Sequence, residues 1–295
     1  LIVVPTTSLV HQMTSDFEDY GFPKNSIHKI MSGQEKQTNK MIVVSTWQSI
    51  HRMPKEWFDD FDVIVGDEAH LFKAKSLITI MTNLDKCKYR FGFTGTLDGT
   101  ETNKLILQGL FGSIRKVTTT SELMQKKQVA ELQIKAIVLN YSKEERKNLC
   151  DKDYATERDY IINLERRNKF IRNLSLSLEG NVLVLYQFKK QGKQLLEMIN
   201  NSDTDRKVFF ISGEIDGERR EEIRKNIESE KDAIIVASFG TSSTGINIRN
   251  LHNIIFASPS KSRVRNLQSI GRGLRLSETK TSVTLYDIAD NFSTD

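Results

Sequence analysis

Two adjacent carboxylates, Asp67 and Glu68, directly follow the apolar run Val63 to Val65, in the segment Phe61-Asp62-Val63-Ile64-Val65-Gly66-Asp67-Glu68-Ala69-His70. In open sheets of parallel strands, ligands bind where the strands end at their carboxyl side. Asp67 is suited to holding Mg²⁺, partly through water, because Mg²⁺ prefers one or two carboxylates with phosphates and waters. Glu68 is suited to orienting or deprotonating a water that attacks a γ-phosphate. The alternative is a solvated pair of surface acids.

Two arginines, Arg272 and Arg275, lie three residues apart in the segment Gln268-Ser269-Ile270-Gly271-Arg272-Gly273-Leu274-Arg275. On a helix they would share a face and present two guanidinium groups to a polyphosphate. The two glycines of the segment would let a partner surface come close. The alternative is a surface salt-bridge pair.

Hydroxyl-bearing residues follow several apolar runs and could donate to phosphate oxygens without regard to base sequence. For each of them a helix N-cap or a turn is an equally good interpretation. These residues are Thr6, Ser45, Thr46, Thr241, Ser242, Ser243 and Thr244. Trp47 and Phe188 could stack on bases, but core packing is the favoured interpretation for both.

Short apolar runs rich in β-branched residues alternate with longer segments of helical periodicity, which predicts strands and helices in alternation. The predicted strands are residues 1–4, 41–44, 63–65, 89–94, 182–186, 208–211, 233–237, 253–257 and 283–287, and the helices include 7–20, 189–200 and 218–229. Strands that are apolar along their whole length indicate parallel sheets covered on both faces. Each half of the chain carries its own set, which favours two α/β domains.

Residues 142–178 contain many charges at mostly helical spacings, and we expect one or two helices leading into the second domain. A basic stripe for phosphates is one hypothesis, although a solvated helix face is favoured over it. The residues of this stripe are Arg158, Arg166, Arg167, Lys169 and Arg172.

The composition favours a protein without a membrane span. The 295 residues have a net charge of +5, and residues 113–180 hold 14 Lys and Arg against 10 Asp and Glu, which suits a polyanion partner. No apolar run approaches the roughly 18 to 20 residues of a membrane span, and we expect no secretory leader. The two cysteines, Cys87 and Cys150, have neither disulfide-framework nor metal-ligand spacing, so a cytoplasmic location is expected (the host cytoplasm for a phage protein).

The motifs together resemble the superfamily 2 helicases of the DEAH/DExH type. Residues 3–12 (VVPTTSLVHQ) resemble motif Ia, 43–49 (VVSTWQS) the next strand-end DNA contact, and Asp67-Glu68-Ala69-His70 the DEAH box itself. Residues 93–96 (FTGT) resemble motif III, 182–188 motif IV, 237–247 motif V, and 268–275 the Q-x-x-G-R-x-x-R pattern of motif VI. The motifs occur in the family's order over nearly the whole chain.

The resemblance implies two RecA-like α/β domains of the P-loop NTPase type, the first one truncated at its N-terminus. The expected boundaries are residues 1–135 for the first domain, 136–180 for a helical connector and 181–295 for the second. The implied catalytic residues are Asp67, Glu68, His70, Gln268, Arg272 and Arg275; the nucleotide would contact Asp67, Glu68, Gly245, Asn247, Arg272 and Arg275. Nucleic acid would contact Pro5, Thr6, Thr46, Gln48, Thr94, Thr96, Gln187, Thr241 and Ser243. For His70 an ordinary turn histidine is the alternative.

One family feature is absent from the sequence: the Walker A loop, G-x-x-x-x-G-K-[ST], which cradles the phosphates. The Gly192-Lys193 pair is followed by Gln194 and lies in a predicted helix. We therefore expect a fragment that begins at motif Ia and, by itself, binds ATP weakly or not at all.

The resemblance implies an ATP- and Mg²⁺-dependent DNA helicase or translocase that remodels D-loops, R-loops, stalled forks and Holliday junctions. Expected partners are branched, single- and double-stranded DNA and also RNA–DNA hybrid, with the protein a monomer. Two alternatives stay open. One is the motor of a restriction or nuclease complex, and the other is a nucleic-acid-binding module without ATPase activity.

Overall fold

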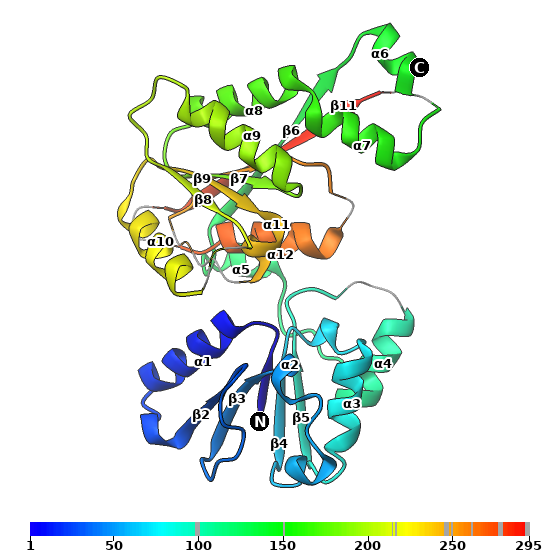
Figure 1. Cartoon of the computed structure of the whole chain (residues 1–295), viewed down its shortest axis with the longest axis vertical. Helices are drawn as coiled ribbons and strands as arrows, with labels where there is room; N and C mark the ends of the chain where they lie inside the picture. Colours follow the sequence, from blue (N-terminus) through cyan, green and yellow to red (C-terminus); the bar gives the residue numbers. More distant parts are fainter. Residues whose placement is uncertain are drawn as a thin grey trace. The chain divides into compact units, whose positions relative to one another are not determined.

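The computed structural model describes residues 1–97, 101–149, 151–213, 215, 217–244, 248, 250–260, 262–276 and 280–292. The chain forms two compact units, Leu1–Val117 and Thr118–Asp295 (Figure 1). Each unit contains one sheet in which every strand pair is parallel. The expected pair of parallel-sheet α/β domains is therefore confirmed.

The first unit has a five-stranded sheet in the order β2-β3-β1-β4-β5. Its strands are β1 (Ile2–Val4), β2 (Ile27–Ile30), β3 (Ile42–Thr46), β4 (Val63–Asp67) and β5 (Tyr89–Phe93). Helix α1 (Thr7–Asp19) packs on one face against β1, β2 and β3. The opposite face is covered by α2 (Trp47–Ile50), α3 (Lys75–Asn83) and α4 (Glu101–Phe111). Coverage on both faces explains why the central strands are apolar throughout.

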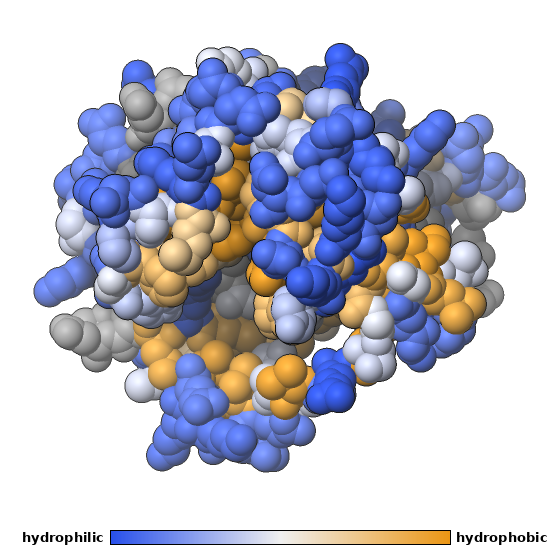
Figure 2. All heavy atoms as spheres, turned by 90° about the horizontal axis from the view of Figure 1, so that it is seen from below, coloured by the Kyte–Doolittle hydropathy of each residue, from blue (hydrophilic) through white to orange (hydrophobic). Residues whose placement is uncertain are grey.

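The edge strand β5 differs from its neighbours because its side chains on the α1 face are exposed. Tyr89 is 58% exposed, Phe91 49% and Phe93 61%, and Val63 beside them on β4 is 39% exposed. Figure 2 shows apolar surface beside hydrophilic surface on the face seen from below. Among the described residues, then, α1 covers only part of this face of the sheet.

The second unit has a six-stranded sheet in the order β6-β11-β10-β7-β9-β8. Its strands are β6 (Glu131–Asn140), β7 (Val182–Tyr186), β8 (Val208–Ile211), β9 (Ile234–Ser238), β10 (Asn253–Phe256) and β11 (Ser282–Asn291). Its helices are α5 (Thr120–Gln125), α6 (Lys143–Leu149), α7 (Tyr154–Asn163), α8 (Glu165–Ser177), α9 (Lys189–Asn200), α10 (Gly217–Ser229), α11 (Phe239–Thr244) and α12 (Arg263–Gly273). Helices α8 and α9 pack on one face of the sheet, and α10, α11 and α12 pack on the other.

The units divide after Val117, whereas the sequence places a boundary after residue 135. The physical reason is β6, which pairs along its whole length with β11 and so belongs to the second sheet. The expected connector of one or two helices corresponds to the end of β6 followed by three helices, α6, α7 and α8, within the second unit. In the part of the chain that the structure describes, no helix has the length and apolar character needed to cross a membrane.

Candidate functional site

The predicted site residues of the first unit lie together at the carboxyl ends of the strands of its sheet. Val4 is in register with Thr46, and Asp67 with Phe93. Because the strands are parallel, the segments that follow β1, β3, β4 and β5 leave the sheet at the same side. These segments carry Pro5 and Thr6, Thr46 and Gln48, Asp67 and Glu68, and Thr94 and Thr96.

The carboxylate pair is held in a tight turn at the end of β4. Glu68 has a φ of 50°, in the left-handed region, which non-glycine residues rarely adopt and which often marks functional sites. Its backbone N–H donates to Asp67 Oδ1 at 2.9 Å. This hydrogen bond holds the Asp67 carboxylate at the end of β4.

Asp67 is half-buried, and this burial raises the pKa of its carboxyl above the ordinary value. The hydrogen bond from the Glu68 N–H opposes the rise, while the negative charge of Glu68 adds to it. A carboxylate of this kind gains from a nearby cation. Among the described residues no group of three or more His, Cys, Asp or Glu forms a metal cage. The residues therefore fit Mg²⁺ held by one or two carboxylates with phosphate and water, and not a closed protein site.

His70 connects the carboxylate turn to the end of β5. Its Nδ1 lies 2.9 Å from Thr94 Oγ1 and 3.3 Å from Glu68 Oε2. The Thr94 hydroxyl donates to the Thr96 carbonyl at 3.0 Å and accepts the Thr96 N–H at 3.2 Å. Since its one proton goes to Thr96, the hydroxyl is satisfied when His70 Nδ1 carries a proton and donates to it. His70 is thus hydrogen-bonded to Thr94 and lies in close contact with the Glu68 carboxylate.

Two glycines allow the DEAH turn to lie close to the sheet. A Cβ atom on Gly66 would meet the Phe72 ring at 2.6 Å, and one on Gly92 would meet the Ala69 Cβ at 3.0 Å. Phe72 packs edge to face against Phe111 of α4, with ring centroids 5.0 Å apart. The DEAH turn is therefore seated directly on β4 and β5 by close packing.

The residues predicted to contact nucleic acid divide into exposed and buried groups. Thr6 caps α1 by accepting the Leu9 N–H, and Gln48 is exposed with its Nε2 donating to the Pro5 carbonyl at 3.4 Å. Thr46 is buried and its hydroxyl lies 2.9 Å from Ser49 Oγ. Thr96 is also buried. Gln48 is thus exposed and contacts the Pro5 carbonyl, Pro5 and Thr6 are partly exposed, and Thr46 and Thr96 are buried.

In the second unit, Gln187 follows β7, is exposed, and donates its N–H to Ser258 Oγ at 2.8 Å. Thr241 is buried in α11, where its N–H donates to Ser238 Oγ in an N-cap arrangement. Arg275 is exposed just after α12. Gly245 and Asn247 lie outside the described residues, as do the side chains of Ser243, Gln268 and Arg272.

The basic-stripe hypothesis for α7 and α8 is wrong for Arg167, which is 1% exposed. Arg158, Arg166 and Lys169 each form an ion pair with an acidic side chain, which agrees with the favoured interpretation of a solvated face. Trp47 packs against the core, as expected. Sequence reasoning missed Ser258 and Gln191, which meet behind Gln187. Ser258 lies two residues after β10, so the rule applied to other strand-end hydroxyls would have found it.

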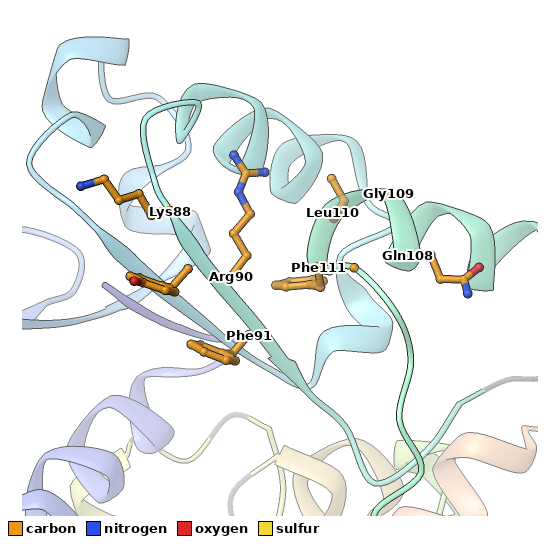
Figure 3. A pocket seen from close by; sticks show the side chains of 9 residues that line it. Lys88, Arg90, Phe91, Gln108, Gly109, Leu110 and Phe111 are labelled. Carbon is orange, nitrogen blue, oxygen red and sulfur yellow. The ribbon is translucent and has the colours of Figure 1, made fainter.

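A hollow of about 550 Å³ lies between β5 and α4, lined by residues that include Lys88, Arg90, Phe91, Gln108 and Leu110 (Figure 3). Lys88 and Arg90 lie toward the beginning of β5, whereas Asp67 is in register with Phe93 at its end. This hollow is therefore separate from the carboxylate site and holds none of the predicted site residues.

Comparison with known proteins agrees with this geometry. The family "Type III restriction enzyme, res subunit" matches residues 1–99, and "Helicase conserved C-terminal domain" matches residues 165–277. The chain is 40% identical to the ATP-dependent DNA helicase uvsW of Enterobacteria phage T4, over 99% of this chain and 59% of that protein. The chain belongs to the superfamily 2 helicases. The family expected from the motifs is therefore confirmed.

Solved structures share the fold of this helicase chain at low identity. A fragment of a putative HsdR subunit of a type I restriction enzyme from Vibrio vulnificus has a TM-score of 0.69 at 20% identity, covering 97% of this chain and 52% of that one. S. cerevisiae Dbp5 bound to RNA and ADP BeF3 has a TM-score of 0.68 at 13% identity, covering 99% and 71%. The helicase chain spans about half the length of the curated relatives it matches, 59% of uvsW and 47% of a mimivirus helicase.

Proposed function

We propose that the chain is the motor part of an ATP-dependent DNA helicase or translocase. The observation that carries the proposal is the Asp67–Glu68 turn at the carboxyl end of a parallel sheet, where the neighbouring strands β1 and β3 lead into Pro5, Thr6 and Gln48. The 40% identity to a protein named as a DNA helicase supports the choice of DNA.

On the nucleotide side, Asp67 would hold Mg²⁺ partly through water. Burial raises the pKa of its carboxyl, so a bound cation would stabilise the ionised form. Glu68 would orient the attacking water and accept its proton. His70 lies within reach of Glu68 and Thr94 and so would keep the Glu68 carboxylate in one orientation. Magnesium ATP, when bound, supplies the phosphoanhydride bond that is cleaved.

The roles of the second unit in hydrolysis rest on the motif resemblance. Arg272 and Arg275 would neutralise charge on the transferred phosphoryl group, as arginine fingers do. Gln268 would assist them, and Gly245 and Asn247 would contact the nucleotide. The sequence has no G-x-x-x-x-G-K-[ST], so we propose that turnover needs a phosphate-binding loop that these 295 residues do not supply.

On the nucleic-acid side, contacts to phosphates would be insensitive to base sequence and sensitive to salt. Gln48 and Gln187 are exposed members of the predicted set, and Pro5, Thr6 and Thr94 are partly exposed. The remaining members of the predicted set are Thr46, Thr96, Thr241 and Ser243. In this proposal the buried ones hold the turns at the ends of the β-strands, and these turns present backbone amides to the nucleic acid.

The finer part of the proposal is that the protein remodels branched DNA as a monomer. Its support is the close similarity to uvsW. The test is unwinding by the protein with its phosphate-binding loop on forks, D-loops, R-loops, Holliday junctions and plain duplex of equal length. Equal rates on all substrates would reject branch preference. A cytoplasmic location belongs to the same proposal, supported by the cysteine spacing and by the phage relative.

A second candidate is the motor of a restriction complex, favoured by the restriction-enzyme family match over residues 1–99. It predicts that the whole protein cuts duplex DNA in an ATP-dependent manner. The helicase proposal predicts strand separation without cleavage, so one gel assay with Mg²⁺ and ATP separates the two.

The catalytic assignment is tested by Glu68→Gln in the protein with its phosphate-binding loop. We expect a loss of DNA-stimulated ATP hydrolysis of about 10²-fold or more, the range for a positioned general base, with ATP binding unchanged. Glu56→Gln, on the short helical turn at Lys55–Phe58, is the matched control and should retain full activity. Full turnover by Glu68→Gln would reject the role of Glu68.

A further inference from the structure

A continuous row of buried hydrogen bonds crosses the second unit and ends at Gln187. It begins with Arg167 of α8, whose side chain is fully buried with that of Asp290 at the end of β11. Arg167 Nε donates to Asp290 Oδ1 at 2.8 Å and to Oδ2 at 3.1 Å. Its Nη1 donates to the carbonyl of Ala257, just after β10, at 2.6 Å. The arginine therefore ties the ends of two neighbouring strands to α8.

The row continues through α9, which lies beside α8 on the same face of the sheet (Figure 1). Gln191 is 1% exposed, and its Nε2 donates to the Ala257 carbonyl at 3.1 Å and to Asn168 Oδ1 at 3.2 Å. Its Oε1 accepts the Ser258 hydroxyl proton at 2.5 Å. Ser258 Oγ in turn accepts the Gln187 N–H at 2.8 Å. Both ends of the buried amide are thus used.

Buried polar groups are costly unless they are hydrogen-bonded, so a row of this length needs a reason beyond packing. A buried arginine–carboxylate pair contributes little net stability compared with apolar side chains of similar volume. What the row does provide is a defined position for the loop between β7 and α9. Phe188, the N-cap residue of α9, makes no side-chain capping hydrogen bond, and the hydrogen bond from the Gln187 N–H to Ser258 Oγ holds this loop.

The loop between β7 and α9 is followed by positively charged residues, which suit binding to a polyanion. Gln187 is exposed, and the next residues, Lys189 and Lys190, are exposed lysines at the first turn of α9. Arg158 lies over the Phe188 ring, with 4.8 Å from its guanidinium carbon to the ring centroid, and is paired with Asp159 at 2.7 Å. Gln187 is therefore exposed, with its backbone held by Ser258, and two exposed lysines follow it closely in the chain.

We propose that Ser258 and Gln191, supported by Arg167, are positioning residues that set Gln187 for contact with a nucleic-acid strand. The inference rests on the proposed function, because it assumes that this edge meets nucleic acid. It differs from a purely structural role for the row, which would affect folding stability but not the contribution of Gln187 to binding.

The test is a double-mutant cycle on the 295-residue chain, with a fluorescent single-stranded DNA oligonucleotide at fixed salt. Gln187→Ala and Ser258→Ala should each weaken binding by about three- to tenfold, the range for one lost hydrogen-bonding contact. The double variant should bind DNA no more weakly than the single variant with the larger loss of affinity, because Ser258 acts through Gln187. Ser177→Ala, which removes an exposed hydroxyl of α8 bonded to the Leu174 carbonyl, is the matched control and should bind like the wild type.

Each outcome decides a separate point. A wild-type chain that does not bind DNA rejects the proposed function, and this inference with it. Wild-type affinity in either single variant, or additive losses in the double variant, rejects the positioning role alone. Gln191→Met, which keeps the size of the side chain but removes its three hydrogen bonds, should reproduce the loss of Ser258→Ala. Circular dichroism on every variant separates a lost contact from a lost fold.

Discussion

Gly66 shows how a single residue supports the candidate site. It precedes Asp67 on β4, and a Cβ atom there would lie 2.6 Å from the Phe72 ring and 3.0 Å from Phe111. Neither ring can move freely, because Phe72 is buried and both rings pack against each other. We expect Gly66→Ala to destabilise the first unit by about 1–3 kcal/mol, the usual cost of overpacking a core. Urea unfolding followed by tryptophan fluorescence measures this change.

The control is Gly95→Ala, at a glycine whose added Cβ would meet nothing within 4 Å. Its backbone φ lies outside the positive range, so alanine should be accepted with a change below about 0.5 kcal/mol, as for most surface substitutions. Equal stabilities of the two variants would show that the ring pair yields, and would contradict the packing argument.

At the residue scale the sequence predicts the type of chemistry better than the direction of each side chain. Asp67 and Glu68 were predictable because two carboxylates at the end of an apolar strand have a definite place in a parallel sheet. Thr46 and Thr241 look the same as exposed hydroxyl residues in the sequence, yet both are buried with a nearby hydroxyl partner. Arg167 lies in a segment rich in charged residues, and its burial depends on a helix face shared with Asn168 and Ile171 and on the distant partner Asp290.

At the scale of elements, the long strand β6 was not predicted. As a result the first domain was expected to end at residue 135, whereas the first unit ends at Val117. Its sequence, Glu-Leu-Gln-Ile-Lys-Ala-Ile-Val-Leu-Asn, mixes polar and apolar residues because β6 is an edge strand and largely exposed. Its place in the second sheet depends on pairing with β11, about 150 residues further along. Pairings this distant leave no local signal, whereas the continuous apolar runs of β7, which is fully buried, and β8 were predicted with their observed bounds.

Helix α6 begins with a local motif whose stability should depend on pH. The Ser142 N–H donates to Glu145 Oε2 at 3.0 Å and its hydroxyl at 2.8 Å, with further contacts from Tyr160 and Arg166. These hydrogen bonds, the backbone one first, lower the pKa of Glu145 from 4.5 to about 2. The stabilisation is therefore fully present above pH 4.5 and is lost as the pH falls toward 2.

We expect Glu145→Gln to lower the melting temperature at pH 7, and the difference from the wild type to narrow steadily between pH 5 and pH 3. Calorimetry across this range measures the effect. Glu144→Gln removes the charge of an exposed neighbour in the same turn and is the matched control. A difference that stays constant down to pH 3 would show that the ionised Glu145 carboxylate does not stabilise α6.

At the scale of the whole molecule, each unit has its own cores: those of the first unit lie within residues 1–117, and those of the second within residues 118–295. Two domains were predictable because apolar strands and helical segments alternate in each half of the chain. The exposed stripe of Tyr89, Phe91 and Phe93 was not predictable, since an apolar strand looks the same in sequence whether or not a helix covers it.

Both tryptophans of the chain, Trp47 and Trp57, lie in the first unit, so their fluorescence reports the unfolding of that unit alone. Ile235 is fully buried in β9 of the second unit, and Ile235→Ala should cost about 2–5 kcal/mol there. We expect the urea midpoint of this variant to be lower when unfolding is followed by circular dichroism at about 222 nm, the helix band, to which both units contribute. The midpoint followed by tryptophan fluorescence should not change. Leu77→Ala, in the core of the first unit, should lower the fluorescence midpoint instead. If Ile235→Ala lowers the urea midpoint measured by both probes, the two units unfold as one. Cores that unfold independently would not pass a loss of stability in the second unit on to the first.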